Sequence, residues 1–289
     1  MRRTTIASTM DLFEIRKTII TAVASSDSLF ERLVLKGGNA LEIVHRIGGR
    51  ASLDLDFSME GDFENPEEIG RTLGAALTDR FDAVGFEVFD YQFEPRPSTA
   101  TSGEKWGGYS ATFKLISRTE AQRLNRDIGA MRREAHVVGE ATQKRIFTIE
   151  ISKYEYCSGK MLATVEEFDC FVYTPLMIAA EKLRAICQQM AAYSQRKHPA
   201  PRPRDFYDIH SVVTNAAVDL TTGTELIRRM FSAKDVPLSL LADMEGQREF
   251  HRQGWSAVEN AVRNALLPFD AYFDFVLAEV KKLEILWNP

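Results

Sequence analysis

The spacing of hydrophobic and polar residues predicts a mixed first part of the chain. Over residues 8–26 apolar side chains recur at the spacing of an amphipathic helix. A short apolar run at 33–35 leads into a second helix at 39–47. Asn65-Pro66 is a typical helix start and predicts a helix to about Asp82. Four strands follow, with a helix at 119–134 among them, and we place the strands at 86–93, 109–117, 145–153 and 165–172.

The second part of the chain has a helical pattern. Thr174-Pro175 combines an N-cap with proline at the first helical position, and an apolar stripe continues to Met190. A break rich in proline and basic residues, 194–204, separates this helix from those predicted at 203–216, 222–232, 237–250 and 256–284. We therefore expect an α+β protein in which residues 1–173 form a mixed β-sheet flanked by helices and residues 174–289 are all helical.

Two aspartates lie in the most regular strand pattern. From Arg50 to Ser58 polar and apolar residues alternate strictly. Asp54 and Asp56 therefore share one face of a strand, about 7 Å apart along it. Like charges this close repel unless a cation lies between them, and carboxylate oxygens are ligands that Mg²⁺ prefers. An Asp-x-Asp strand is also common as a solvated face, so its context decides between the two interpretations.

That context is a glycine pair upstream of the acids. Gly37-Gly38 predicts a turn that opens a short helix, where free backbone N–H groups favour a phosphate. The pair lacks the rest of a Walker or dinucleotide motif. In this order, however, a phosphate-binding turn and a metal-binding acid pair are the groups that nucleotide transfer needs.

Three further residues are candidates for the same chemistry. Glu150, in the middle of a predicted strand, is the best third carboxylate for a second metal ion, ahead of Asp90, Glu94 and Glu155. Alternatively, Glu150 is simply a solvent-facing residue of an ordinary amphipathic strand. Lys182 lies beside the apolar stripe, where it either snorkels to solvent or points into a cleft. Asp205 begins the next helix, where an acid also complements the helix dipole.

Composition limits the alternatives. The chain has 289 residues, 45% of them hydrophobic, and a net charge of −5, so it has no overall basic field for nucleic acid. Its three cysteines lack the spacing of a zinc site or a disulfide framework, and its five histidines show no ligand spacing. No apolar run approaches the roughly 18 residues of a membrane helix, and no signal peptide is evident. We expect a soluble, cytoplasmic protein without membrane contact.

Four segments together resemble the motifs of the AbiEii/AbiGii nucleotidyltransferase toxins, which belong to the DNA polymerase β-like nucleotidyltransferase superfamily. The segments are Lys36-Gly37-Gly38-Asn39-Ala40-Leu41, Arg50-x-Ser52-x-Asp54-Leu55-Asp56-Phe57, Glu181-Lys182-Leu183-Arg184-Ala185 and Arg204-Asp205-x-Tyr207-Asp208. They cover about residues 33–210. The link between the third and fourth segments is longer than is usual for the family. The gap between Gly38 and Asp54 is longer than is usual for the superfamily.

The resemblance implies a Mg²⁺-dependent transfer of a nucleoside monophosphate from an NTP to an acceptor hydroxyl. By motif position, the phosphates would contact Gly37, Gly38 and Ser52, and the triphosphate would also engage Lys182. Asp54 and Asp56 would hold Mg²⁺, joined by Glu150 on the strand argument above, and Asp205 would be a further essential acid. Residues 1–173 would then be the nucleotidyltransferase domain, and residues 174–289 would close the active-site cleft.

The resemblance also implies partners. A bacterial toxin of this kind has a cognate antitoxin, and the expected acceptor is RNA, such as a tRNA 3′ end, entering past the basic segment 196–204. Two alternatives stay open. One is a nucleotidyltransferase that modifies a protein or a small molecule, and the other is a non-catalytic nucleotide- or RNA-binding module.

Overall fold

The chain folds into two compact units. A computed structural model describes residues 10–47, 52–97, 107–138, 143–195, 198–262 and 265–288. The first unit comprises Met1–Leu35, Leu53–Lys153 and Leu162–Phe171, and the second comprises Lys36–Ser52, Tyr154–Met161 and Val172–Pro289. Two short segments from before residue 173 thus belong to the second unit, whereas the sequence suggested one boundary after residue 173. That boundary, and the closure of a cleft by residues 174–289, stay predictions.

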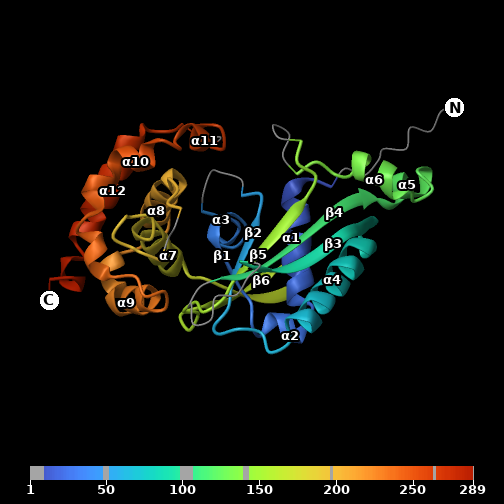
Figure 1. Cartoon of the computed structure of the whole chain (residues 1–289), viewed down its shortest axis with the longest axis horizontal. Coiled ribbons are helices and arrows are strands. Elements are labelled where there is room, and N and C mark those ends of the chain that lie inside the picture. Colours follow the sequence, from blue (N-terminus) through green and yellow to red (C-terminus); the bar gives the residue numbers. More distant parts are fainter. Residues whose placement is uncertain are drawn as a thin grey trace. The chain divides into compact units, whose positions relative to one another are not determined.

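A seven-stranded sheet dominates the first unit (Figure 1). Its strand order is β3-β4-β5-β2-β1-β7-β6. Strands β2 and β5 are parallel, and β5, β4 and β3 are antiparallel to one another in turn, so the sheet is mixed and the predicted α+β class is confirmed. The strands are β1 (Val34–Lys36), β2 (Leu55–Ser58), β3 (Phe86–Arg96), β4 (Gly108–Ser117), β5 (Phe147–Ser152), β6 (Met161–Val165) and β7 (Phe168–Val172).

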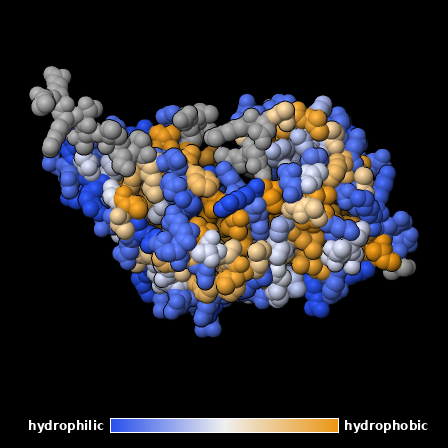
Figure 2. All heavy atoms as spheres, turned by 180° about the vertical axis from the view of Figure 1, so that it is seen from behind, coloured by the Kyte–Doolittle hydropathy of each residue, from blue (hydrophilic) through white to orange (hydrophobic). Residues whose placement is uncertain are grey.

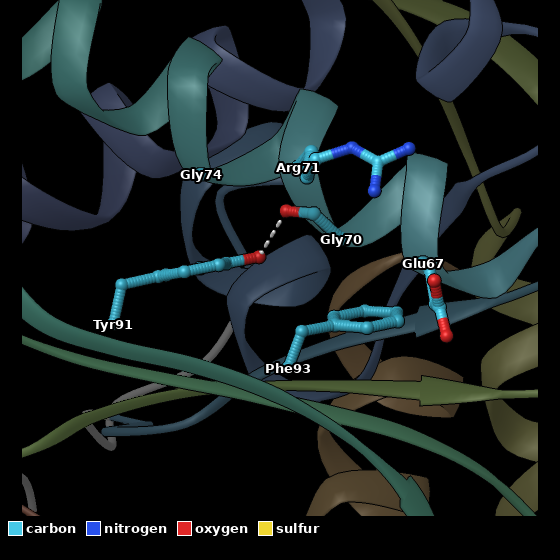
Figure 3. A pocket seen from close by; sticks show the side chains of 6 residues that line it. All are labelled: Glu67, Gly70, Arg71, Gly74, Tyr91 and Phe93. Carbon is cyan, nitrogen blue, oxygen red and sulfur yellow. Dashed lines mark hydrogen bonds between the residues drawn. The ribbon is translucent and has the colours of Figure 1, made fainter.

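Helices α1 (Leu12–Ala24) and α4 (Pro66–Ala83) lie alongside the strands, as Figure 1 shows; the short α2 (Asp27–Phe30) follows α1. Two glycines let α4 approach β3 closely: a Cβ on Gly70 would come within 2.8 Å of Phe93, and one on Gly74 within 2.9 Å of Tyr91. The Tyr91 hydroxyl donates to the Gly70 carbonyl at 2.7 Å. These four residues, with Glu67 and Arg71, line the open pocket in Figure 3. The glycines thus set how closely the helix and the sheet pack.

Two predicted elements of the first unit are interrupted. The helix expected at 119–134 is two helices, α5 (Arg118–Arg123) and α6 (Ile128–Glu134), because Asn125 and Arg126 adopt left-handed φ angles of 50° and 53°. Asp127 then caps the second helix by accepting from the Ala130 N–H at 2.7 Å. The strand expected at 165–172 is likewise wrong, since strands β6 and β7 meet at a turn with Glu166 at φ 54°.

The second unit is mostly helical. Its short N-terminal segment holds α3 (Gly37–Asn39) and a π-helical turn, Ala40–Val44, where one helix was expected. Its main helices are α7 (Pro175–Cys187), α8 (Pro203–Asn215), α9 (Thr224–Ser232) and α12 (Phe269–Lys281). Phe206 of α8 stacks on Phe273 of α12 with ring centroids 4.9 Å apart, and both rings are fully buried. These aromatic residues form the core between α8 and α12.

The two long helices predicted near the C-terminus are also wrong. The first is divided into 3₁₀ turns at Leu238–Leu241 and Met244–Gln247 and helix α10 (Arg248–Arg252). The second is divided into α11 (Ser256–Glu259), α12 and a final 3₁₀ turn, Glu284–Leu286. Pro268 is the N-cap of α12, and a proline inside a continuous helix would remove a hydrogen bond and clash with the preceding turn.

None of the described helices is long and apolar enough to cross a membrane. The face of the molecule in Figure 2 carries hydrophilic side chains with hydrophobic ones between them.

Candidate active site

A row of polar side chains crosses one face of the sheet in the first unit. In the strand register Asp56 of β2 lies beside Glu150 of β5, Glu150 beside Ser110 of β4, and Ser110 beside Glu94 of β3. We call these four residues the acid row. The next row, on the opposite face, is apolar (Leu55, Ile149, Ala111 and Phe93). The register therefore confirms the expected placement of Glu150 next to the aspartate strand, while its role stays a prediction.

Asp54 lies on the same side of the sheet as the acid row. It occupies a bend just before β2, since the strand begins at Leu55 and not at Arg50, which lies outside the described residues. Its carboxylate is 3.3 Å from the ammonium of Lys144, which is also 3.5 Å from the Thr148 hydroxyl. Thr148 is two residues before Glu150 on β5 and so points to the same face. The Lys144 contact thus brings the Asp54 carboxylate to this face, but Asp54 is not part of the strand on which the prediction of a shared face rested.

This face suits a hydrated cation. Within the described ranges, no three acidic, histidine or cysteine side chains converge on one metal position. However, Mg²⁺ needs only one or two carboxylates because it keeps several waters. The hydroxyls of Ser58 and Ser110 are buried on this face, and no described group bonds to them, which is costly unless a ligand or its water does so. The donors therefore fit Mg²⁺ on Asp54 and Asp56, with Glu150 beside them as a predicted further ligand.

The glycine turn lies in the second unit. Gly37 has a φ of 69°, which a glycine adopts without strain, and α3 starts at this residue. Gly38 is buried and has no such left-handed angle. Ser52 is half-buried, and residues 48–51 before it lie outside the described residues. The predicted turn is present.

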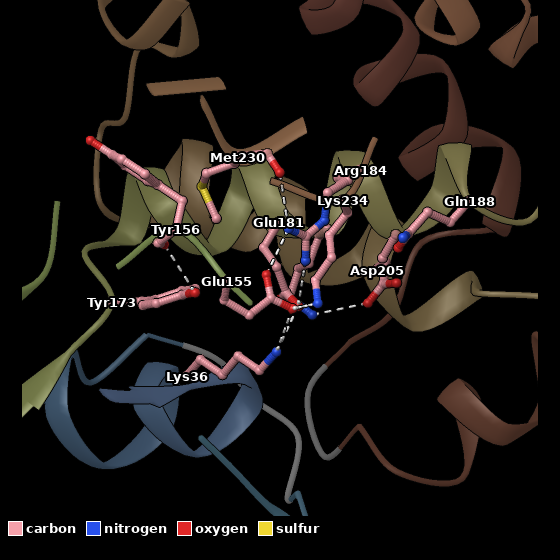
Figure 4. A network of polar contacts seen from close by, with 12 residues as sticks. Lys36, Glu155, Tyr156, Tyr173, Glu181, Arg184, Gln188, Asp205, Met230 and Lys234 are labelled. Atoms are coloured by element: carbon pink, nitrogen blue, oxygen red, sulfur yellow. Dashed lines mark hydrogen bonds and ion pairs between the residues drawn. The ribbon is translucent and has the colours of Figure 1, made fainter. Parts of the chain in front are cut away.

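Next to this turn the second unit contains an ion network (Figure 4), made of Lys36, Glu155, Glu181, Arg184 and Lys234. We call it the buried ion network, because all of its members are buried except Glu181, whose side chain is 17% exposed. The Lys36 ammonium is 3.1 Å from Glu181 and 3.9 Å from Glu155. Glu155 also pairs with Arg184 at 2.7 Å and with Lys234 at 3.5 Å. Burial acts to raise the pKa of Glu155, but the charges of Arg184, Lys36 and Lys234 outweigh it and lower that pKa to about 2.

Lys182 and Asp205 lie together in the same unit. The Lys182 ammonium is 3.0 Å from Asp205 and 2.7 Å from Asp208, and each of these residues is at most 5% exposed. Arg202 also pairs with Asp205. Burial opposes ionisation of Asp205, yet Arg202 and Lys182 hold the pKa of that carboxyl well below its usual range. The expected return of α8 toward Lys182 is therefore confirmed, and the snorkelling interpretation is wrong because the ammonium is buried.

Sequence reasoning missed most of the buried ion network. Glu155 was considered only as a metal ligand, and Lys234 was not considered at all. One available signal was Arg184, a charged residue between Leu183 and Ala185 in the apolar stripe of α7, which is buried at 2% exposure. A charge in such a position requires a buried partner of opposite sign.

Asp90 has a structural role. It lies at a β-bulge of β3 with φ 52°, and its carboxylate accepts from Lys114 at 2.9 Å and from Arg132 at 2.7 Å. These hydrogen bonds, that from Arg132 first, lower the pKa of Asp90 to about 2. It is therefore committed to holding α6 against the sheet.

Comparison with known proteins identifies a family that the chain matches. The family model described as nucleotidyl transferase AbiEii toxin, type IV toxin–antitoxin system, matches residues 18–279. No curated protein matches the chain. Among solved structures, an antigenic nucleotidyltransferase-like protein from Paracoccidioides brasiliensis is similar at 14% identity over 76% of this chain and 92% of that chain, with a TM-score of 0.32. A structural similarity this weak says nothing about the site.

Proposed function

Because the chain belongs to the AbiEii family of nucleotidyl transferase toxins from type IV toxin–antitoxin systems, we propose that it transfers a nucleoside monophosphate from an NTP to the hydroxyl of an RNA, with Mg²⁺ as its cofactor. The family makes the chain a nucleotidyltransferase and implies a cognate antitoxin as its partner. The metal and the acceptor are the parts that the proposal adds.

The acid row and Asp54 are the observation that carries the proposal. Asp54 and Asp56 would hold Mg²⁺, with Glu150 beside them as a third acid. The bound ion would neutralise charge on the phosphates and lower the pKa of the attacking hydroxyl.

Residues of the second unit would bind the triphosphate. Gly37, Gly38 and Ser52 would contact its oxygens through backbone and hydroxyl groups, and Lys182 would place a positive charge beside it. Asp205, the further essential acid, would hold the Lys182 ammonium in the orientation that binding requires, because the two groups are 3.0 Å apart and buried.

An acceptor such as a tRNA 3′ end is proposed from the resemblance and from the basic segment before α8. Arg202 and Arg204 of that segment are described, whereas Arg196 and Lys197 lie outside the described residues. With a net charge of −5, the protein would depend on such a local patch to attract RNA.

The test is incubation of the protein with each labelled NTP and total RNA, with Mg²⁺ or with EDTA. We expect label in RNA only when Mg²⁺ is present. Label in protein or in small molecules alone would contradict the RNA acceptor, and equal transfer in EDTA would contradict the metal. If no acceptor is labelled in any condition, the proposed reaction fails.

Substituting the first glycine of the turn should weaken NTP binding. Gly37→Ala forces a side chain into a left-handed angle, which costs about 1–2 kcal/mol, and it displaces the backbone that would approach the phosphates. We expect the dissociation constant for NTP to rise about tenfold, measured by titration calorimetry. Gly61→Ala is a matched control because Gly61 has nearly the same φ, 68°, in the first unit, and nothing lies within 4 Å of its added Cβ. Equal NTP affinity in both variants would remove Gly37 from the phosphate site.

A further inference from the structure

Lys36 connects the glycine turn to a distant helix. It is the last residue of β1 and immediately precedes Gly37. Its side chain is 5% exposed, and its ammonium lies 3.1 Å from Glu181, which follows it by 145 residues. Figure 4 shows this side chain extending from the turn segment toward Glu181 and Glu155. The contact joins two segments that are far apart in the sequence.

Each residue of this ion pair is the sequence neighbour of a group that would bind the triphosphate. Lys36 immediately precedes Gly37 in the chain, and Glu181 immediately precedes Lys182. A single contact thus links the backbone next to both groups that would bind the triphosphate. Arg184 pairs with both carboxylates near the Lys36 ammonium, at 2.7 Å to Glu155 and 3.7 Å to Glu181. The two acids that Lys36 contacts are therefore themselves held in place.

We propose that Lys36 is a positioning residue whose ammonium fixes the Gly37-Gly38 turn against helix α7, which carries Lys182. The inference rests on the proposed function, since it assigns both elements to triphosphate binding. Lys36 touches no reacting atom in this assignment. Its removal should therefore impair the binding of the phosphates more than the chemical step.

Lys234 provides a matched comparison. Like Lys36 it is 5% exposed, and it contacts the same Glu155, at 3.5 Å where Lys36 is at 3.9 Å. It follows α9 and lies almost 200 residues after the glycine turn in the sequence, whereas Lys36 is joined directly to Gly37. Lys36→Met and Lys234→Met each remove one positive charge from the buried ion network, but only the first releases the turn.

The experiment measures the binding of tripolyphosphate with Mg²⁺, a probe that has no base, by titration calorimetry. It also measures KM and kcat for an equimolar NTP mixture with total RNA, and the melting temperature. For Lys36→Met we expect the dissociation constant and KM to rise about tenfold, as for one lost charge-assisted contact, with kcat within about threefold. Lys36→Arg should recover most of the loss. Lys234→Met should lower the melting temperature about as much and leave the dissociation constant unchanged.

Two results would overturn the inference. One is an equal rise of the dissociation constant in Lys36→Met and Lys234→Met, which would mean that only the stability of the network matters. The other is an unchanged constant in Lys36→Met. If that variant does not fold, Glu181→Gln takes its place, and an unchanged constant there overturns the inference too. Failure of the wild-type protein to bind tripolyphosphate or transfer nucleotide would instead overturn the proposed function.

Discussion

Replacing Asp56 with asparagine should reduce nucleotide transfer by about 1,000-fold or more while the fold stays intact. Loss of one carboxylate from the pair weakens the hold on Mg²⁺, and a loss of about 4 kcal/mol in transition-state stabilisation corresponds to this factor. Because Asp56 lies beside Glu150 in the register, removing its charge also relieves a like-charge pair. The melting temperature should therefore stay the same or rise slightly. Initial rates with labelled NTP, together with thermal melts, check both parts. Asp54→Asn should lose transfer to a similar extent, but it also loses the ion pair with Lys144, so no rise in its melting temperature is expected.

The control for this prediction is Glu94→Gln. Glu94 belongs to the same acid row, but on the edge strand β3, and it undergoes the same chemical change. We expect its transfer rate to stay within about twofold of the wild type. Full activity in Asp56→Asn would refute the metal assignment, and equal losses in both variants would show that the whole face, rather than the acid pair, supports the reaction.

Replacing Glu155 with glutamine should lower the free energy of unfolding by about 3–5 kcal/mol at pH 7. The substitution leaves Arg184, Lys36 and Lys234 buried together without the carboxylate that they share, and breaking a buried ion pair from one side costs about this much. Denaturant titration measures the effect. Glu225→Gln is the control, because Glu225 pairs with Arg229 on the exposed surface of α9 and should cost less than about 0.5 kcal/mol.

Glu155 should also account for part of the loss of stability of the protein in acid. Its pKa is about 2 in the folded protein and 4.5 in an unfolded chain. Because the folded value is the lower one, the stabilisation is complete above pH 4.5 and is lost as the pH falls toward 2. It amounts to about 3 kcal/mol, since one pKa unit is worth about 1.4 kcal/mol. The stability difference between wild type and Glu155→Gln should therefore shrink between pH 4.5 and 2, and a constant difference would contradict the assignment.

Local sequence pattern predicted the neighbouring Asp56 and Glu150 of the acid row well and the turns poorly. Alternation over β2 and β5 determines which face Asp56 and Glu150 share, because the strand period is two wherever the register is kept. The left-handed φ angles at Asn125, Arg126 and Glu166 cannot be predicted from such a pattern. Asn adopts such angles more readily than Arg or Glu, but none of these residue types requires them, so the surrounding packing decides whether a helix or strand is interrupted there.

The buried ion network shows the other limit of sequence reasoning. Periodicity places Lys182 at the edge of a stripe and Arg184 inside it, which indicates that a charge is buried. It cannot identify Lys36, 145 residues before Glu181, as the partner, because partner choice depends on how distant segments meet. The motif segments that contain Lys36, Lys182 and Asp205 are evident in the sequence, whereas their ion pairs depend on the tertiary structure.

The way the chain passes back and forth between its two units limits how the protein could be divided. A fragment starting at residue 174 would contain Glu181, Arg184 and Lys234 but would lack Lys36 and Glu155, which come from the segments Lys36–Ser52 and Tyr154–Met161. Arg184 and Lys234 would then lose the carboxylate that they share. An insertion, a gene fusion or a recombination event at residue 173 would therefore separate partners of the buried ion network and leave charged side chains in both pieces without them.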